Sequence, residues 1–475
     1  MVMDYKEFVS KQKAMLVAPA GHGKTHAIAE CLNYTTGRQL ILTHTHAGVA
    51  SLKEKIKKLG LSEQKIHVGT ISGFAQKYAH AFTIQADFPS QFQSKEYYQL
   101  IEEKTIALLA LTPVKRVIAA SYNGVFVDEY QDCTESQHTL VLALADILPT
   151  RIFGDHLQGI FGFGNNVLVD MTDTPKMKGF GEHKYELTEP RRWENHNKEL
   201  GQALKLMRSN LDSRQPINLA DHSCLEVLIA KPDDLFNFEK EYSKKIWSVR
   251  GERNLLLIHP DGFSIGPRMK VISAFKNSFS LVEAIDDKDF YKIATRFDDC
   301  NAENLEQTIR DVCFEVFNST KLNIWFNKRG LKRKTKPEEI AIIDPVKIQL
   351  NATKQQFSFM GIIEIIQKIK QLPGILCYRG ELLHALIKSL QEAQLNFVSV
   401  NTSMIERRNQ TRRLGRKVDG RSIGTTLLTK GLEFDTVVIL DAHEFKCRKH
   451  LYVALTRAKK RLIVISETSI LSPDS

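Results

Sequence analysis

The sequence predicts an α/β fold made of two parallel-sheet domains, each with a helical insertion. Three observations indicate this fold. Short apolar runs alternate with amphipathic stretches through the first half of the chain, which is typical of a parallel sheet with helices on both faces. A mostly helical pattern follows over residues 285–394. Strand-like runs then return after residue 395, so the second domain is completed only by the C-terminal part of the chain.

The expected elements divide the chain into four segments. Residues 1–190 form the first domain, with a helical insertion at about 82–118 between two turn signals. Residues 191–284 begin the second domain, 285–394 form its helical insertion, and 395–475 complete it. The expected strands are AMLVA (14–18), LILT (40–43), HVGT (67–70), GVFVDE (124–129), RIFGD (151–155), LEVLIA (225–230), NLLLIHP (254–260), FVSV (397–400), SIGTTLL (422–428), TVVILD (436–441) and RLIVIS (461–466).

The composition is that of a globular protein with a modest positive charge. A hydrophobic content of 43% with 25% charged residues excludes a collagenous, disordered or coiled-coil chain. The net charge of +11 only hints at a polyanionic partner. No apolar run approaches the roughly 18 residues that cross a bilayer, and the N-terminus lacks the apolar segment of a signal peptide. We therefore expect a cytoplasmic protein without membrane contact, with its seven scattered cysteines as free thiols.

A phosphate-binding loop is predicted directly after the first strand, at Ala18-Pro19-Ala20-Gly21-His22-Gly23-Lys24-Thr25. Backbone N–H groups of the glycine turn and of the following helix can surround a β-phosphate. Lys24 would neutralise the β- and γ-phosphate oxygens, and the Thr25 hydroxyl would bind Mg²⁺. His22 fills a variable position. A turn that merely starts a helix is the alternative, but it leaves two glycines beside Lys-Thr unexplained. The expected cofactors are ATP and Mg²⁺.

Paired carboxylates end another buried strand, GVFVDE (124–129). Because the carboxyl ends of parallel strands meet at one edge of the sheet, Asp128 and Glu129 should emerge beside the phosphate loop. Successive side chains of an extended chain point in opposite directions, so the two acids can have different chemical roles. Asp128 would hold Mg²⁺ through water, and Glu129 would accept a proton from the attacking water. An isolated Asp-Glu pair is more often solvated at a helix start, but the preceding loop favours the catalytic interpretation.

Further segments extend this pattern along the chain. Residues 127–132 read VDEYQD and residues 153–163 read FGDHLQGIFGF, and both resemble motifs of superfamily one helicases of the UvrD/Rep/PcrA type. The resemblance implies two RecA-like domains with helical insertions. The remaining motifs follow in order as LTHTHA (42–47) with LKEKI (52–56), VGTIS (68–72), LTEPRR (187–192), TKGLEFD (429–435) and LYVALTRA (451–458).

The resemblance also implies roles for individual residues. Arg192 and Arg457 would contact the γ-phosphate, and Gln158 would sense it. Glu433 would contact the ribose hydroxyl, while Arg191 takes the place of the aromatic residue that stacks on the base. The residues expected to contact DNA are Thr43, His44, Thr70, Phe161 and Phe163 in the first domain and Thr425 in the second. For Phe161 and Phe163 the alternative is burial in the core.

The expected function is an ATP-dependent single-stranded DNA translocase or helicase of 3′ to 5′ polarity, acting on single-stranded or partly duplex DNA with a protein partner such as a nuclease. Compact helicases of anti-phage systems such as Gabija are similar. The alternative is a regulatory ATPase that responds to nucleotide and DNA and controls a partner without processive unwinding. His44, which replaces the usual Phe, and the pair Phe163-Gly164, which replaces the usual large aromatic residue and Arg, favour this alternative. A small-molecule P-loop kinase does not account for the last two motifs.

Overall fold

The chain divides into two compact units. The first contains Met1–Pro232, Arg413–Lys417 and Lys430–Ser475, and the second contains Asp233–Arg412 and Val418–Thr429. The computed structural model describes residues 3–60, 63–83, 88, 94–162, 167–262, 264–276, 278–283, 288–328, 330–414, 418 and 420–473.

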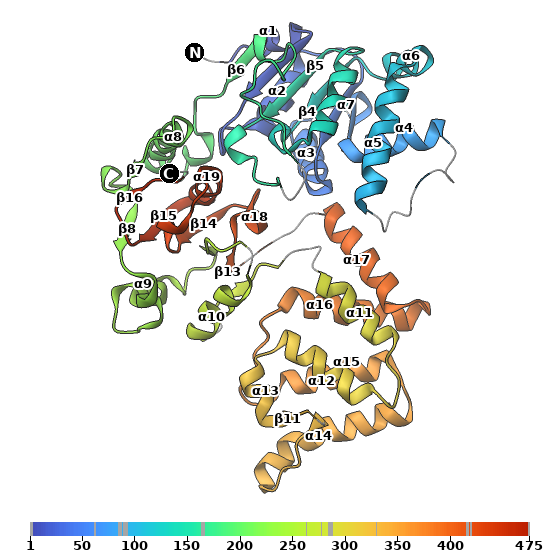
Figure 1. Ribbon diagram of the computed structural model, residues 1–475, viewed down its shortest axis with the longest axis vertical. Helices are drawn as coiled ribbons and strands as arrows, with labels where there is room; N and C mark the ends of the chain where they lie inside the picture. Colours follow the sequence, from blue (N-terminus) through green and yellow to red (C-terminus); the bar gives the residue numbers. More distant parts are fainter. Residues whose placement is uncertain are drawn as a thin grey trace. The chain divides into compact units, whose positions relative to one another are not determined.

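The first unit is built on a parallel six-stranded sheet with the order β3-β2-β4-β5-β1-β6 (Figure 1). The strand β5 lies between β4 and β1, so the loops that follow these three strands leave the same edge of the sheet side by side. The strands are β1 (Lys13–Val17), β2 (Gln39–Thr43), β3 (Ile66–Thr70), β4 (Gly124–Val127), β5 (Thr150–Gly154) and β6 (Lys184–Glu186).

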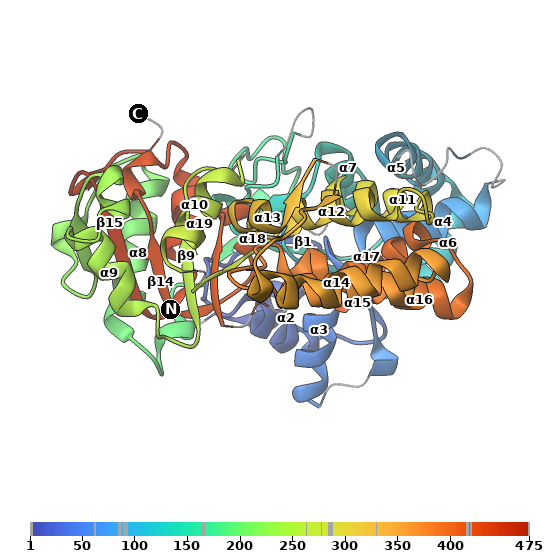
Figure 2. The ribbon, with the colours of Figure 1, turned by 90° about the horizontal axis from the view of Figure 1, so that it is seen from below.

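Helices cover both faces of this sheet, which explains why its central strands are apolar without alternation. Met15 and Val17 of β1 pack into one core cluster, whereas Ala14 and Leu16 pack into the other. Figure 2 shows α5 and α7 on one side of β1 and α2 and α3 on the other. The first cluster is covered by α4 (Ile71–Phe82), α5 (Ser94–Ala110), α6 (Thr112–Ser121) and α7 (Glu135–Ala145), and the second by α1 (Tyr5–Ser10), α2 (Lys24–Asn33) and α3 (His46–Lys58).

The C-terminal part of the chain supplies further strands to the first unit. Here β14 and β15 pair in parallel, and β15 pairs in parallel with β8. A short antiparallel pair joins β16 to β7. The bounds are β7 (Ile217–Asn218), β8 (Glu226–Ile229), β14 (Phe434–Ile439), β15 (Ala458–Ser466) and β16 (Ile470–Leu471), with helices α8 (Lys198–Asp212) and α19 (Arg448–Leu455).

The second unit contains three parallel strands and a helical bundle. β13 (Arg421–Gly424) pairs with β9 (Leu255–Ile258) and β10 (Ser280–Leu281). A buried ion pair ties the strand region to the bundle, because Glu283 after β10 accepts from Arg379 Nε at 2.7 Å. The helices are α9 (Glu241–Val249), α10 (Gly266–Ala274), α11 (Lys288–Asp298), α12 (Leu305–Val316), α13 (Ser319–Trp325), α14 (Pro337–Gln355), α15 (Phe359–Lys370), α16 (Gly380–Asn396), α17 (Val400–Leu414) and α18 (Thr426–Thr429), with a hairpin of β11 (Phe326–Asn327) and β12 (Gly330–Leu331).

The expected α/β class, with two RecA-like parallel-sheet domains and helical insertions, is confirmed. The strand expected at residues 397–400 is wrong. Phe397 ends α16 in the left-handed region at φ 55° and is 92% exposed, while Val400 begins α17 and packs into the helical core. The β-branched residues suggested a strand, but this segment meets a helical bundle. In the described part of the chain, no helix is both long and apolar enough to cross a membrane.

Candidate nucleotide site

The predicted phosphate loop follows β1 and requires both of its glycines. Gly21 and Gly23 have φ values of 75° and 88°, which L side chains rarely adopt. A Cβ on Gly21 would lie 2.4 Å from Trp193 Cζ3, and one on Gly23 would lie 3.3 Å from Arg191 Cδ. Gly23 is also the N-cap of α2 and makes no side-chain cap hydrogen bond. The N-terminus of α2 therefore retains amide groups suited to a phosphate.

Lys24 meets both predicted acids at the end of β4. Its Nζ lies 3.2 Å from Asp128 Oδ1 and 2.5 Å from Glu129 Oε1. Burial lowers the pKa of Lys24, but the two carboxylates outweigh it and the pKa is raised. Burial also raises the pKa of Asp128, whereas Lys24 and Lys430 hold the pKa of Glu129 below its usual value. Glu129 is therefore ionised at neutral pH, which a proton acceptor must be, although a lowered pKa also makes it a weaker base.

The residues at this edge fit a nucleotide with a metal ion. The uncapped helix N-terminus and Lys24, its first residue, match a polyphosphate, and Thr25 is the second residue of the same helix. Mg²⁺ in proteins is usually held by one or two carboxylates together with phosphates and water. Asp128 is 5% exposed and close to Lys24, so it is the carboxylate placed for such an ion.

The loop after β5 carries the predicted sensor Gln158, which is 9% exposed. The side-chain Nε2 of Gln158 donates to Asp155 Oδ2 at 3.0 Å, and its backbone carbonyl oxygen accepts from Lys430 Nζ at 2.6 Å. Gln131 links this loop to the paired acids, because its Nε2 donates to Glu129 and its Oε1 accepts from the backbone N–H of Asp155. The sensor and the expected base therefore belong to one hydrogen-bonded network.

Lys430 and Asp132 lie within two of the motifs, and their motif positions alone predict no role for either residue. Lys430 Nζ lies 2.7 Å from both carboxylate oxygens of Asp132, and these side chains are 6% and 5% exposed. Burial raises the pKa of Asp132 to about 6 against the opposing effect of Lys430. The same ammonium lies 4.4 Å from the centre of the Phe161 ring. The signal that could have indicated this pair is one charge of each sign, Lys430 and Asp132, within two of the quoted motifs.

The arginine segment after β6 lies against the phosphate loop. Arg192 Nη1 donates to the carbonyl of Thr456 at 2.6 Å, and its Nη2 lies 2.9 Å from Glu433 Oε1. Burial raises the pKa of Glu433, but Arg192 and Lys459 outweigh it and the pKa is lowered. Arg191 is exposed and lies against Gly23. Two of the expected nucleotide ligands, Arg192 and Glu433, thus form an ion pair.

Arg457 is 1% exposed at the end of α19. Its Nε donates to the carbonyl of Val453 at 2.8 Å, Nη1 to that of Leu432 at 3.1 Å and Nη2 to Thr456 Oγ1 at 3.0 Å. Burial lowers its pKa to about 10, which still leaves the guanidinium charged at neutral pH. Contact of Arg457 with a γ-phosphate stays a prediction.

The expected DNA-contacting residues of the first unit differ in exposure. Thr43 and Thr70 end β2 and β3 and are 1% and 7% exposed, and Thr70 caps α4 by accepting from the Gly73 N–H. His44 Nε2 lies 3.4 Å from Cys133 Sγ, and burial lowers its pKa to about 4. At neutral pH this imidazole is uncharged, so any contact with DNA would not be an ion pair.

Three more residues are expected to contact DNA, namely the aromatic residues Phe161 and Phe163 and, in the second unit, Thr425. Phe161 is 38% exposed, as a stacking residue requires. Phe163 lies outside the described residues. Thr425 is 2% exposed, and its carbonyl accepts from Thr429 Oγ1 at 2.7 Å.

The predicted phosphate loop, the paired acids and Gln158 follow strands of one parallel sheet at the same edge, an arrangement typical of P-loop nucleotide-binding proteins. Residues 5–164 match the family model of an AAA domain, and residues 425–465 match that of the UvrD-like helicase C-terminal domain. Both matches support the UvrD/Rep-type helicase superfamily.

No curated protein matches this chain significantly. Among solved structures, it is similar to a complex of Arterivirus nonstructural protein 10 (helicase) with DNA, at 10% identity and a TM-score of 0.35. The match covers 97% of this chain and 62% of the length of the viral one.

Proposed function

We propose that the chain hydrolyses ATP with Mg²⁺ and uses the energy to move along single-stranded DNA and open duplex DNA. One observation carries the proposal, namely that Lys24 of the phosphate loop contacts both Asp128 and Glu129. A bound nucleotide and its metal ion supply the polarised γ-phosphate. Lys24 and the N-terminus of α2 orient it, and Glu129 accepts the proton of the attacking water.

DNA engagement is the second part of the proposal. Phe161 supports it, because this exposed ring lies against Lys430, whose ammonium also binds the backbone of Gln158. A base that stacks on Phe161 would therefore act on the residue that holds the sensor. Translocation of 3′ to 5′ polarity, a nuclease partner and an anti-phage role rest on the family resemblance alone.

The test is steady-state ATP hydrolysis with and without single-stranded oligonucleotides. We expect DNA to stimulate hydrolysis and binding to weaken steeply with salt. Strand displacement on duplexes with either a 3′ or a 5′ single-stranded tail then measures polarity, with displacement expected from the 3′ tail. Stimulation without displacement would favour the regulatory ATPase, whereas a rate indifferent to oligonucleotides of every length would contradict DNA-dependent function.

A further inference from the structure

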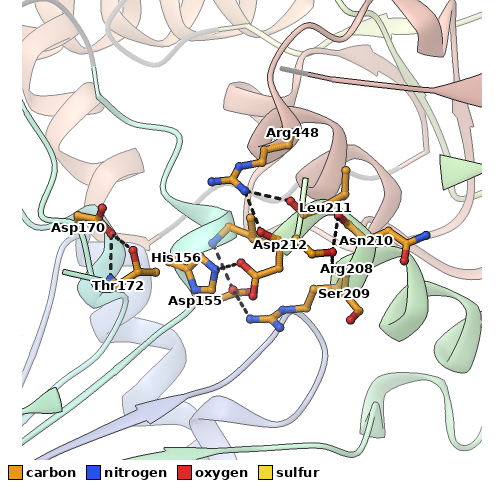
Figure 3. Close-up of polar contacts among 12 residues, drawn as sticks. Asp155, His156, Asp170, Thr172, Arg208, Ser209, Asn210, Leu211, Asp212 and Arg448 are labelled. Carbon is orange, nitrogen blue, oxygen red and sulfur yellow. Dashed lines mark hydrogen bonds and ion pairs between the residues drawn. The ribbon is translucent and has the colours of Figure 1, made fainter. Parts of the chain in front are cut away.

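We propose that Arg208 is a positioning residue for the sensor Gln158, acting through the buried carboxylate of Asp155. The inference rests on the proposed function, because the sensing role of Gln158 is part of it. Arg208 lies on α8, and its side chain reaches Asp155 in the loop after β5 (Figure 3).

Asp155 joins Arg208 to the sensor. Its side chain is fully buried, and its Oδ1 accepts from Arg208 Nη2 at 3.2 Å and from the Leu157 N–H at 3.3 Å. Its Oδ2 accepts from Gln158 Nε2 at 3.0 Å. Tyr452 of α19 also hydrogen-bonds to Asp155. Because the Tyr452 oxygen accepts from the Ala20 N–H at 3.0 Å, its own proton is free to point to the carboxylate.

The charge of Asp155 determines how the Gln158 amide can lie. An ionised carboxylate only accepts hydrogen bonds, so the amide nitrogen must face it and Oε1 must point away. A protonated carboxyl group can also donate, which would permit the reversed amide. An ionised Asp155 therefore keeps the Gln158 oxygen available to a water or phosphate on its other side.

Arg208 is the group that keeps Asp155 ionised. Burial raises the pKa of Asp155, but Arg208 outweighs it and the pKa is lowered. In return, Asp155 raises the pKa of Arg208 against the effect of burial. The other titratable or charged groups around this pair are His156, Tyr452, His22 and Glu186, of which Glu186 Oε1 lies 3.3 Å from Arg208 Nη1.

The helix α8 has anchors that do not involve Arg208. His156 Nε2 lies 2.6 Å from Asp212 Oδ1, and Arg448 Nη1 donates to the carbonyls of Leu211 and Asp212 at 3.1 Å (Figure 3). These contacts hold the C-terminal end of α8 beside the sensor loop. Removal of the Arg208 guanidinium should therefore alter the sensor more than it detaches the helix.

The test compares Arg208→Met with Glu186→Gln, which removes the other partner of the same guanidinium and leaves Asp155 paired. ATP hydrolysis by the full chain is measured from pH 6 to pH 9, together with thermal melting. We expect Arg208→Met to lower kcat about 10- to 100-fold near neutral pH, as misplaced groups do, with little change in KM. The deficit should shrink as pH rises, because Asp155 regains its charge. Glu186→Gln should keep the wild-type kcat and pH profile.

Three results would overturn the inference. They are an Arg208→Met variant with wild-type kcat, one whose deficit is equal at every pH, and a Glu186→Gln variant with the same defect. If Arg208→Met does not fold, Asp155→Asn is measured in its place. The amide that this substitution introduces can donate or accept a hydrogen bond and has no charge to regain. Asp155→Asn should therefore lower kcat without recovery at high pH. Wild-type kcat for Asp155→Asn would also refute the role. Glu129→Gln separates a failure of this inference from a failure of the proposed function. If Glu129→Gln is inactive, the results above overturn only the role of Arg208. Wild-type hydrolysis by Glu129→Gln would contradict the proposed function itself.

Discussion

Replacing Lys430 by Met should destabilise the first unit more at high pH than at low pH. In the wild type, Lys430 Nζ lies 2.7 Å from both oxygens of Asp132, and both side chains are almost completely buried. Removing one partner of a buried ion pair costs about 3–5 kcal/mol, because the other charge is left without compensation. Met keeps the length of the side chain and removes the charge.

The pH dependence follows from the pKa of Asp132. With Lys430 in place this pKa is about 6, because burial raises it and Lys430 opposes burial. Without Lys430 it rises further, so the folded variant holds a proton that the unfolded chain releases near pH 4. Stability linked to a raised carboxyl pKa is present at low pH and is lost as pH rises through the folded-state pKa. Above pH 6 the variant should therefore lose up to about 1.4 kcal/mol per pH unit relative to the wild type, until the pH reaches the raised pKa of Asp132.

Urea unfolding at pH 6 and pH 8 measures this difference. It is followed by tryptophan fluorescence in a chain with Trp247 and Trp325 of the second unit replaced by Phe, so that the buried Trp193 of the first unit is the reporter. The variant should lose more stability at pH 8 than at pH 6, by at most about 3 kcal/mol over these two pH units. The control is Lys430→Met combined with Asp132→Asn, in which residue 132 is no longer a carboxylate and the pH-dependent loss should disappear. An equal loss at both pH values for the single variant would refute the reasoning.

Three further predictions concern the candidate site. Glu129→Gln should bind ATP but lower kcat about 10²- to 10⁴-fold through loss of the base, and phosphate release with ATP titration measures both; wild-type turnover would remove Glu129 as the base. Gly21→Ala should lower the melting temperature and weaken ATP binding, because φ is 75° and Trp193 lies 2.4 Å from the new Cβ; Gly60→Ala, with φ 70° and no atom within 4 Å, is the control. Phe161→Ala should lose about 1–3 kcal/mol of oligonucleotide affinity with basal hydrolysis retained, and a large drop in melting temperature would instead indicate a core residue.

Local sequence patterns predicted much of the first unit. Apolar runs between amphipathic stretches indicated a parallel sheet, and parallel strands bring their carboxyl ends to one edge. This rule was sufficient to expect Lys24 near Asp128 and Glu129, which the structure brings within 3.2 Å and 2.5 Å. The glycines of the phosphate loop were predictable for the same local reason, since their backbone conformation depends on a turn of a few residues.

Long-range charge pairing was decided only by the tertiary structure. Lys430 and Asp132 are 298 residues apart, and Arg208 and Asp155 are 53 apart. The burial of Arg457 among carbonyl oxygens was equally unexpected from its motif. Sequence periodicity shows which face of an element a residue occupies, but not which distant element covers that face. A buried charge selects its partner from the groups that packing brings near it, so these contacts follow from the fold as a whole.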